Sequence, residues 1–302
     1  MRIVIRITGA WPSRSPCLRV SCILLPMALP AKRGPFRRGA LVAAIAVIAS
    51  ALPLSAFAQA QPAQRTPVLV ELFTSEGCSD CPPADDLLGQ LDSRQPIPGV
   101  DAIVLSEHVT YWNHDGWRDP FSFDQMTERQ QDYQRQFGLS EVYTPQMVVD
   151  GAEQFVGNDA NKLTTALTRA AATPKLAIQI SDAHQAADGS IAFSVHAPAD
   201  NKASLYAAVA ENATVSEVTR GENKGRTLHH VAVVRVLKEF GSGKADGRPL
   251  ELSGSNLVAA EKTGTPLRLV VFLVNRHSNH VVAVAEQTLN PSASESTEQT
   301  QK

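Results

Sequence analysis

The spacing of apolar and polar residues along this chain changes at Thr173-Pro174. Before this point, short apolar runs alternate with segments whose apolar residues recur every three or four positions, which is typical of strands alternating with helices. After it, short alternating runs follow one another and no helix of useful length is needed, which is typical of antiparallel strands. The pattern therefore predicts an α/β part followed by an all-β part.

The first part begins with a mostly apolar run at 67–73, expected to be a strand buried in a sheet, and continues into a helical segment. A second strand at 100–105 leads into an aromatic loop at 111–121 and then a helix that ends at Gly138. An Asp150-Gly151 turn indicates a β-hairpin, which a last helix follows. The predicted order is strand, helix, strand, loop, helix, two strands and helix.

The second part indicates an antiparallel β-sandwich of about seven strands, one of which the pattern does not place. Its six clear runs are 176–180, 191–196, 204–210, 231–237, 267–275 and 281–285. The segment 221–230 contains two glycines but lacks the ending of a phosphate-binding loop, so we expect a hairpin loop that packs against the first part. If the segment ends as a strand, His229 and His230 face opposite sides, which weakens a metal site made of both.

The N-terminal region has the features of an export signal. Four basic residues between 32 and 38 precede the apolar run 40–54, which ends at Ala56-Phe57-Ala58. We expect cleavage after Ala58 and a periplasmic or secreted protein. The predicted division is a leader at 1–58, a linker at 59–66, the α/β domain at 67–173, the sandwich domain at 175–289 and a disordered tail at 290–302.

Cleavage would change the charge and the cysteine count of the chain. Residues 1–58 carry eight Lys/Arg and no Asp/Glu, so 20 basic residues would remain against 30 acidic ones. An acidic chain argues against nucleic acid, and without its leader we expect no stable insertion into a membrane. Cys17 and Cys22 would leave with the leader, so that only Cys78 and Cys81 remain.

These two cysteines form a C-x-x-C pair between a predicted strand and a predicted helix, which is typical of a thioredoxin-like redox site. Cys78 is expected to be the exposed nucleophile and Cys81 the more buried resolving thiol. The helix N-terminus favours a thiolate at Cys78 and lowers its pKa, whereas the negative charges of Glu76 and Asp80 oppose it. We therefore expect a reduction potential toward the reducing end. Pro145, preceded by Thr144, is predicted to be the cis-proline that lies beside such a site.

Four separated stretches, at 71–85, 108–112, 116–120 and 142–146, carry the sequences ELFTSEGCSDCPPAD, HVTYW, GWRDP and VYTPQ. In these stretches the chain resembles the secreted thioredoxin-like family known as domain of unknown function 1223. The resemblance covers nearly all of the chain after the leader. It implies a thioredoxin-like fold with a C-x-x-C site, and it supplies no known substrate.

The leading functional hypothesis is thiol–disulfide exchange without an organic cofactor, acting on a protein thiol or disulfide and recycled by a redox partner. Trp112, Trp117 and Phe121 are candidates for a hydrophobic lip that contacts the substrate, although self-packing of the loop explains them equally well. One alternative is a copper or zinc site made by Cys78, Cys81 and His108. The other is a non-catalytic binding module in which the two cysteines form a structural disulfide.

Overall fold

The computed structural model describes residues 65–289 except 187, 199–201, 255–256 and 258–264. Its central strand near the candidate site is β1 (Thr66–Thr74), which pairs in parallel with β2 (Val100–His108) and antiparallel with β3 (Gln146–Val149). Seven consecutive residues of β1 are buried, from Val68 to Thr74. A strand covered on both faces needs such a nearly continuous apolar run.

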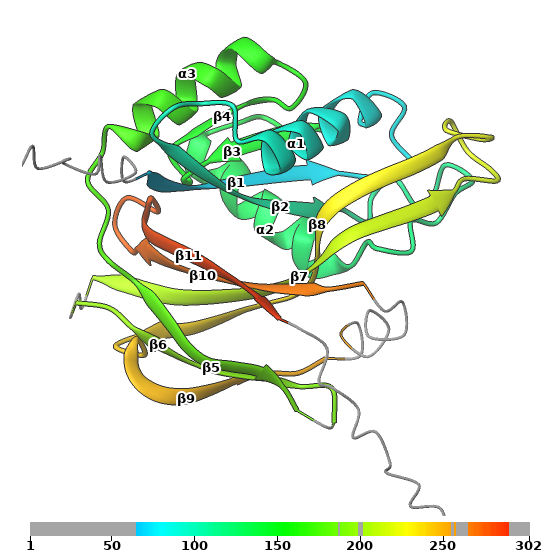
Figure 1. Ribbon diagram of the computed structural model, residues 1–302. Helices are drawn as coiled ribbons and strands as arrows, with labels where there is room; N and C mark the ends of the chain where they lie inside the picture. Colours follow the sequence, from blue (N-terminus) through cyan, green and yellow to red (C-terminus); the bar gives the residue numbers. More distant parts are fainter. Residues whose placement is uncertain (1–64, 187, 199–201, 255–256, 258–264, 290–302) are drawn as a thin grey trace, which may run out of the picture. The chain divides into compact units, whose positions relative to one another are not determined.

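The remaining elements follow in the order shown in Figure 1. The helices are α1 (Pro82–Arg94), α2 (Asp124–Phe137) and α3 (Ala160–Ala171). The other strands are β4 (Glu153–Val156), β5 (Gln179–Gln185), β6 (Ile191–His196), β7 (Ala203–Glu217), β8 (Thr227–Ser242), β9 (Asp246–Leu252), β10 (Leu267–Asn275) and β11 (Val281–Leu289). The order of elements predicted for the first part is confirmed, and β9 is the strand that the pattern did not place.

Helices cover both faces of the sheet around β1 (Figure 1). Side chains alternate between the two faces of a strand. Glu71 and Phe73 contact Tyr133 of α2, whereas the neighbouring Leu72 lies beside Ala84 of α1. The region around the N-terminus of α1 and the region around α2 are therefore on opposite faces of β1.

One sheet of eight strands runs through both parts of the chain, in the order β11-β10-β7-β8-β2-β1-β3-β4. The two parts join where β2 and β8 pair in parallel, with Ser106 opposite Val233. A single hydrophobic core includes Leu72 and Ile103 from the first part and Val234 and Phe272 from the second. The division into 67–173 and 175–289 did not anticipate this shared sheet and core.

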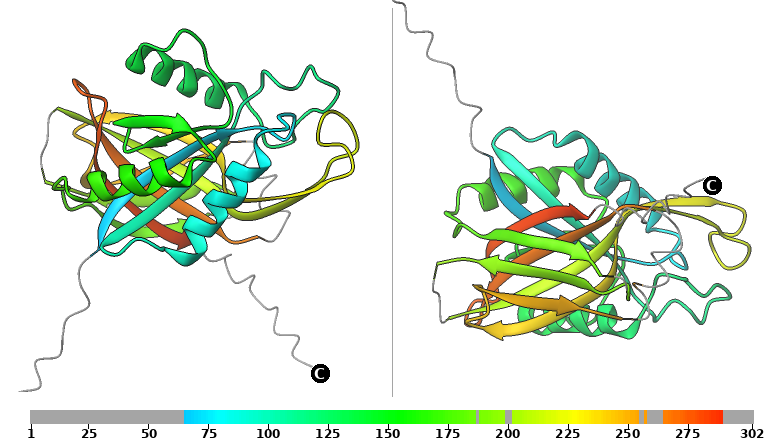
Figure 2. Two further views of the ribbon diagram at one scale, coloured as in Figure 1. Left: turned by 90° about the horizontal axis from the view of Figure 1, so that it is seen from above. Right: turned by 60° about the horizontal axis from the view of Figure 1, so that its bottom comes forward.

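The second sheet has the order β5-β6-β9 and packs against one face of β7, β10 and β11 (Figure 2). The core between the two layers includes Ile191 and Phe193 of β6, Leu205 of β7 and Leu269 and Val271 of β10. This part of the molecule is thus two layers of mainly antiparallel strands.

The predicted leader at 1–58, most of the linker and the tail at 290–302 lie outside the described residues. The last residue of the predicted linker, Thr66, is the first residue of β1. Within the described part of the chain, no helix is both long enough and apolar enough to cross a membrane.

Candidate functional site at the Cys78–Cys81 disulfide

Cys78 and Cys81 form a disulfide in the turn between β1 and α1, with a Cα–Cα distance of 5.4 Å. Cys81 is the residue directly before α1, and its carbonyl accepts hydrogen bonds from the N–H groups of Ala84 and Asp85. Pro82 is the first residue of the helix, where the absence of an N–H group costs nothing. The placement of the pair between a strand and a helix is as predicted.

Both cysteines are buried: 1% of Cys78 and none of Cys81 is exposed. The prediction that Cys78 is exposed is therefore wrong for this oxidised state. The sequence around Cys78 could not reveal this, because the segment that covers it lies more than 140 residues further along the chain.

The covering segment is the loop between β7 and β8, residues 218–226, here called the hairpin loop. Asn223 is fully buried and donates hydrogen bonds to the carbonyls of Glu76 (2.8 Å) and Cys78 (2.9 Å). The backbone N–H of Ser79 donates to the carboxylate of Glu222 (3.1 Å). These bonds confirm the prediction that the loop packs against the first part.

Close backbone packing at Gly221 brings the hairpin loop against the aromatic loop. Gly221 has φ +72°, and a Cβ atom there would lie 3.0 Å from the Cβ of Trp117 and 3.1 Å from the carbonyl oxygen of Asp115. Glycine suits both the left-handed backbone and the short approach.

A buried histidine of β8, His230, lies between two carboxylates that flank the disulfide. Its Nε2 is 3.3 Å from Glu76 Oε1, and its Nδ1 is 3.7 Å from Asp85 Oδ2. Burial on its own would lower the pKa of His230, but Asp85 and Glu76 outweigh it and raise the pKa to about 10. His230 is therefore a cation at neutral pH. Glu76, which also accepts a hydrogen bond from Trp117 Nε1 (2.7 Å), is not the unpaired charge that the sequence suggested.

A second buried pair joins His108, the last residue of β2, to Asp119 of the aromatic loop. His108 Nδ1 lies 2.7 Å from Asp119 Oδ2, which also accepts the backbone N–H of Glu76 at 2.9 Å. Burial would raise the pKa of Asp119, but His108 and two backbone N–H groups lower it below its usual value. The rings of His108 and His230 meet edge to face, with centroids 4.7 Å apart.

Of the three aromatic residues proposed as a substrate lip, Trp117 and Phe121 contact this cluster, whereas Trp112 packs against the apolar cluster around Phe73; all three remain partly exposed. Trp112 Nε1 donates to Thr144 Oγ1 (2.7 Å), and Trp117 Nε1 donates to Glu76. Phe121 packs edge to face against His108, with centroids 5.4 Å apart. Much of their surface is thus used in packing the loop onto the site.

Thr144 and Pro145 lie directly before β3, whose first residue pairs with Phe73 at the end of β1. The bond between them is cis, as predicted. Pro145 and Ala84 of α1 both lie within 3.1 Å of the position that a Cβ of Gly157 would occupy. The proline is therefore next to the first turn of α1, where the disulfide also lies.

The alternative metal site is not formed in this state. Among the described residues, no group of three or more His, Cys, Asp or Glu side chains is arranged to hold a metal ion. Cys78 and Cys81 are bonded to each other, and His108 Nδ1 is engaged with Asp119.

Fold and site together define a class: a mostly β protein with a mixed eight-stranded sheet, a smaller three-stranded sheet and a buried C-x-x-C disulfide at a strand–helix junction. The chain belongs to the family of proteins of unknown function designated DUF1223, whose family model matches residues 69–273. A search of the curated proteins finds no match.

Solved structures similar to this chain include the following two. A protein from Agrobacterium tumefaciens has a TM-score of 0.56 at 24% identity, over 77% of this chain and 97% of its own. The second, HBP35 of Porphyromonas gingivalis, has a TM-score of 0.43 at 14% identity, over 78% of this chain and 80% of its own. The first likeness concerns the fold alone.

Sequence reasoning missed the role of the residues that the second part contributes to the site: Glu222, Asn223 and His230. His230 could have been singled out as a candidate for burial, because successive side chains of a strand point to opposite faces and one of His229 and His230 therefore faces the interior. No local signal indicates which buried partner it meets.

Proposed function

We propose that this protein is an exported thiol–disulfide oxidoreductase with a thioredoxin-like fold, in which Cys78 is the nucleophile and Cys81 the resolving thiol. The observation that carries the proposal is the Cys78–Cys81 disulfide at the β1–α1 junction, with Thr144-Pro145 next to the first turn of α1. The order from β1 to α3 supports the thioredoxin-like assignment.

The reaction we propose is a two-step exchange. In the reduced protein, the Cys78 thiolate attacks one sulfur of a substrate disulfide, forms a mixed disulfide and releases the first substrate thiolate. Cys81, as a thiolate, then attacks the Cys78 sulfur, restores the Cys78–Cys81 disulfide and releases the second substrate thiolate. The substrate gains two electrons, and a dithiol redox partner reduces the disulfide again. Run in reverse, the same steps oxidise a substrate dithiol.

Access to the sulfurs is the main requirement of this proposal. Both cysteines are buried, and Asn223 of the hairpin loop holds the carbonyl of Cys78. We propose that a substrate protein displaces the hairpin loop and lies against Thr144-Pro145, with Trp112 and Trp117 at its edge.

The charges around the pair also bear on the reaction. The positive end of α1 favours a thiolate at Cys78. Because Glu76 is paired with His230, the carboxylates left to oppose this thiolate are those of Asp80 and Glu222, which are exposed and therefore screened by water.

Trapping of mixed disulfides tests the proposal. In cells that make the protein, Cys81→Ala should accumulate covalent adducts with a small set of exported proteins, because the resolving step is removed. Cys78→Ala, which leaves Cys81 as the single thiol of the pair, is the matched control and should trap none. A Cys81→Ala protein that forms no more adducts than this control would contradict the proposal.

Complete burial of the disulfide favours a second candidate, a binding module in which the disulfide is structural. In that case the Cys78→Ser/Cys81→Ser double variant would keep the partners that the native chain captures, and Cys81→Ala would trap no adducts. The two measurements together separate the candidates.

A further inference from the structure

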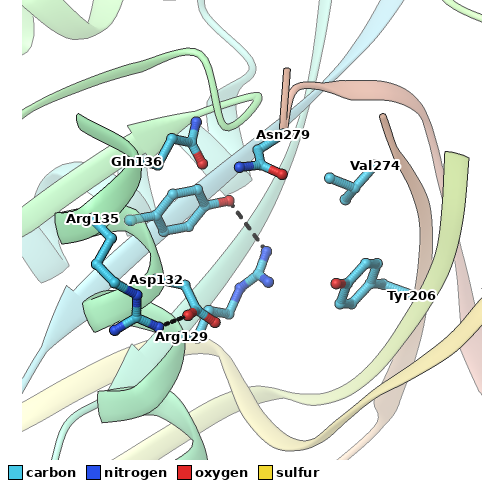
Figure 3. A pocket seen from close by; sticks show the side chains of 8 residues that line it. Arg129, Asp132, Arg135, Gln136, Tyr206, Val274 and Asn279 are labelled. Atoms are coloured by element: carbon cyan, nitrogen blue, oxygen red, sulfur yellow. Dashed lines mark hydrogen bonds and ion pairs between the residues drawn. The ribbon is translucent and has the colours of Figure 1, made fainter. Parts of the chain in front are cut away.

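A polar cavity of about 470 Å³ lies on the face of β1 that α2 covers, away from the disulfide. Five residues of α2 form one wall, and Tyr206 of β7, Val274 of β10 and Asn279 of the β10–β11 turn face them across the space (Figure 3). The α2 residues are Arg129, Asp132, Tyr133, Arg135 and Gln136. The volume is that of a site for a small organic molecule.

Arg129 is the charged group deepest in this cavity, with 13% of its side chain exposed. Its Nε donates to Glu71 Oε1 (2.6 Å), and its Nη2 contacts the same carboxylate and Tyr133 Oη (3.2 Å). The other amino group, Nη1, makes no hydrogen bond with any part of the chain that the structure describes. One edge of the guanidinium is thus occupied, and Nη1 is left for a ligand.

Three aromatic rings hold this guanidinium in place. Its central carbon lies 5.2 Å from the ring centroid of Tyr133, 5.6 Å from that of Tyr206 and 5.4 Å from that of Phe272. An arginine fixed in this way loses little freedom when it binds an acceptor.

The charge of Arg129 is balanced by one carboxylate, that of Glu71. Burial, and then the neighbouring Glu71, raise the pKa of Glu107 well above its usual value, which favours the neutral form of this carboxyl group. Glu71 is the remaining carboxylate at this position. At the cavity mouth, Arg135 is already paired with Asp132.

We propose that this cavity binds a small molecule with a carboxylate, which accepts hydrogen bonds from Arg129 Nη1 and the side-chain amide of Asn279. The apolar remainder of the ligand lies against the ring of Tyr206 and the side chain of Val274. A singly charged carboxylate fits better than a phosphate, because the carboxylates of Glu71 and Asp132 already pair with the two arginines and would repel a doubly charged group more strongly. This site is independent of the thiol chemistry proposed for Cys78.

Calorimetric titration of the oxidised protein with sodium benzoate tests the proposal, with sodium phosphate as a second probe. Benzoate should bind with saturation below about 10 mM at a ratio of one to one, whereas phosphate should not saturate in this range. Asn279→Gly should weaken benzoate binding roughly tenfold, because it removes the amide and keeps the left-handed backbone at φ +55°. Val274→Phe should abolish binding by filling the cavity.

Val156→Phe, at an exposed position on β4, is the matched control and should leave binding unchanged. These substitutions leave Arg129 and Glu71 in place, so the buried ion pair is preserved and the fold is not put at risk. Three results would each overturn the proposal. They are failure of benzoate to saturate, benzoate binding by Asn279→Gly and Val274→Phe that equals binding by the native protein, and tighter binding of phosphate than of benzoate. Binding should be the same in Cys78→Ser, which separates this result from the fate of the redox hypothesis.

Discussion

The positive charge of His230 stabilises two buried carboxylates at the candidate site. Glu76 and Asp85 are both buried, and the imidazolium of His230 lies within 3.7 Å of each. A buried carboxylate without a partner costs several kcal/mol, so the charge state of one histidine affects the stability of the whole site.

The stability of the protein should consequently depend on pH through His230. Its pKa is about 10 in the folded protein and about 6.5 in an unfolded chain. A raised pKa contributes stability that is complete below pH 6.5 and is lost as the pH rises toward 10. We expect the free energy of unfolding, measured by urea denaturation, to fall over this window in the native protein.

His230→Gln should lower stability by about 3 kcal/mol at pH 6 and reduce this pH dependence. His229→Gln, which changes the exposed neighbour, is the control and should do neither. Equal slopes for native protein and His230→Gln between pH 6.5 and 10 would show that His230 is not the group responsible.

Among single residues, the sequence predicted those whose role depends on local geometry. Cys78 and Cys81 follow from their spacing, Gly138 ends α2 with a left-handed backbone, and Asp150 and Gly151 form the turn between β3 and β4. Their conformations are decided within a few residues, which is the range over which a sequence pattern is informative.

At the scale of elements, the hairpin loop covers the buried disulfide. It reaches the C-x-x-C turn because β7 and β8 are long strands, of 15 and 16 residues, that continue past the sheet's junction at Val233. Three hydrogen bonds, two from Asn223 and one to Glu222, join the loop to the turn.

Asn223→Ala should make the disulfide easier to reach. The change removes both hydrogen bonds to the carbonyls of Glu76 and Cys78, which together are worth about 1–3 kcal/mol. We expect dithiothreitol to reduce the pair at least fivefold faster, as measured by alkylation and mass spectrometry.

Lys224→Ala alters an exposed residue of the same loop and should leave the reduction rate unchanged. Unfolding rates measured in parallel separate loop opening from global unfolding. A rate in Asn223→Ala equal to that of the native protein would mean that the loop does not limit access.

The helices and strands themselves were largely predictable, but the pairing of β2 with β8 was not. β8 contains apolar residues suited to several sheet positions, and its partner lies more than 120 residues earlier. Hydrophobic periodicity identifies a strand and its buried face, but carries no information about which neighbour it pairs with.

At the scale of the whole molecule, the shared sheet ties the two parts of the chain together. Two ion pairs between the parts support it: a buried one, in which Lys175 Nζ bonds Asp150 Oδ2 at 2.6 Å, and a partly buried one, in which Arg268 bonds Asp92 of α1 at 2.8 Å. Removing either part would expose the shared core and leave charged groups without partners.

Residues 59–173 made alone should therefore fail to fold. We expect an NMR spectrum with little dispersion and no cooperative thermal transition, and we expect both to be restored when residues 174–302 are supplied as a second chain. A dispersed spectrum and a sharp transition for the isolated fragment would show instead that the first part is an autonomous domain.

Thermodynamic linkage connects the bonds of the hairpin loop to the reduction potential of the Cys78–Cys81 disulfide. If its bonds to the C-x-x-C turn are stronger in the oxidised protein than in the reduced one, the difference lowers the reduction potential, by about 30 mV for each 1.4 kcal/mol. Reciprocity then requires that any molecule holding the loop away from the turn makes the disulfide more oxidising by the same free energy. A partner that binds the hairpin loop would thus change the reduction potential of the Cys78–Cys81 disulfide without contacting either sulfur atom.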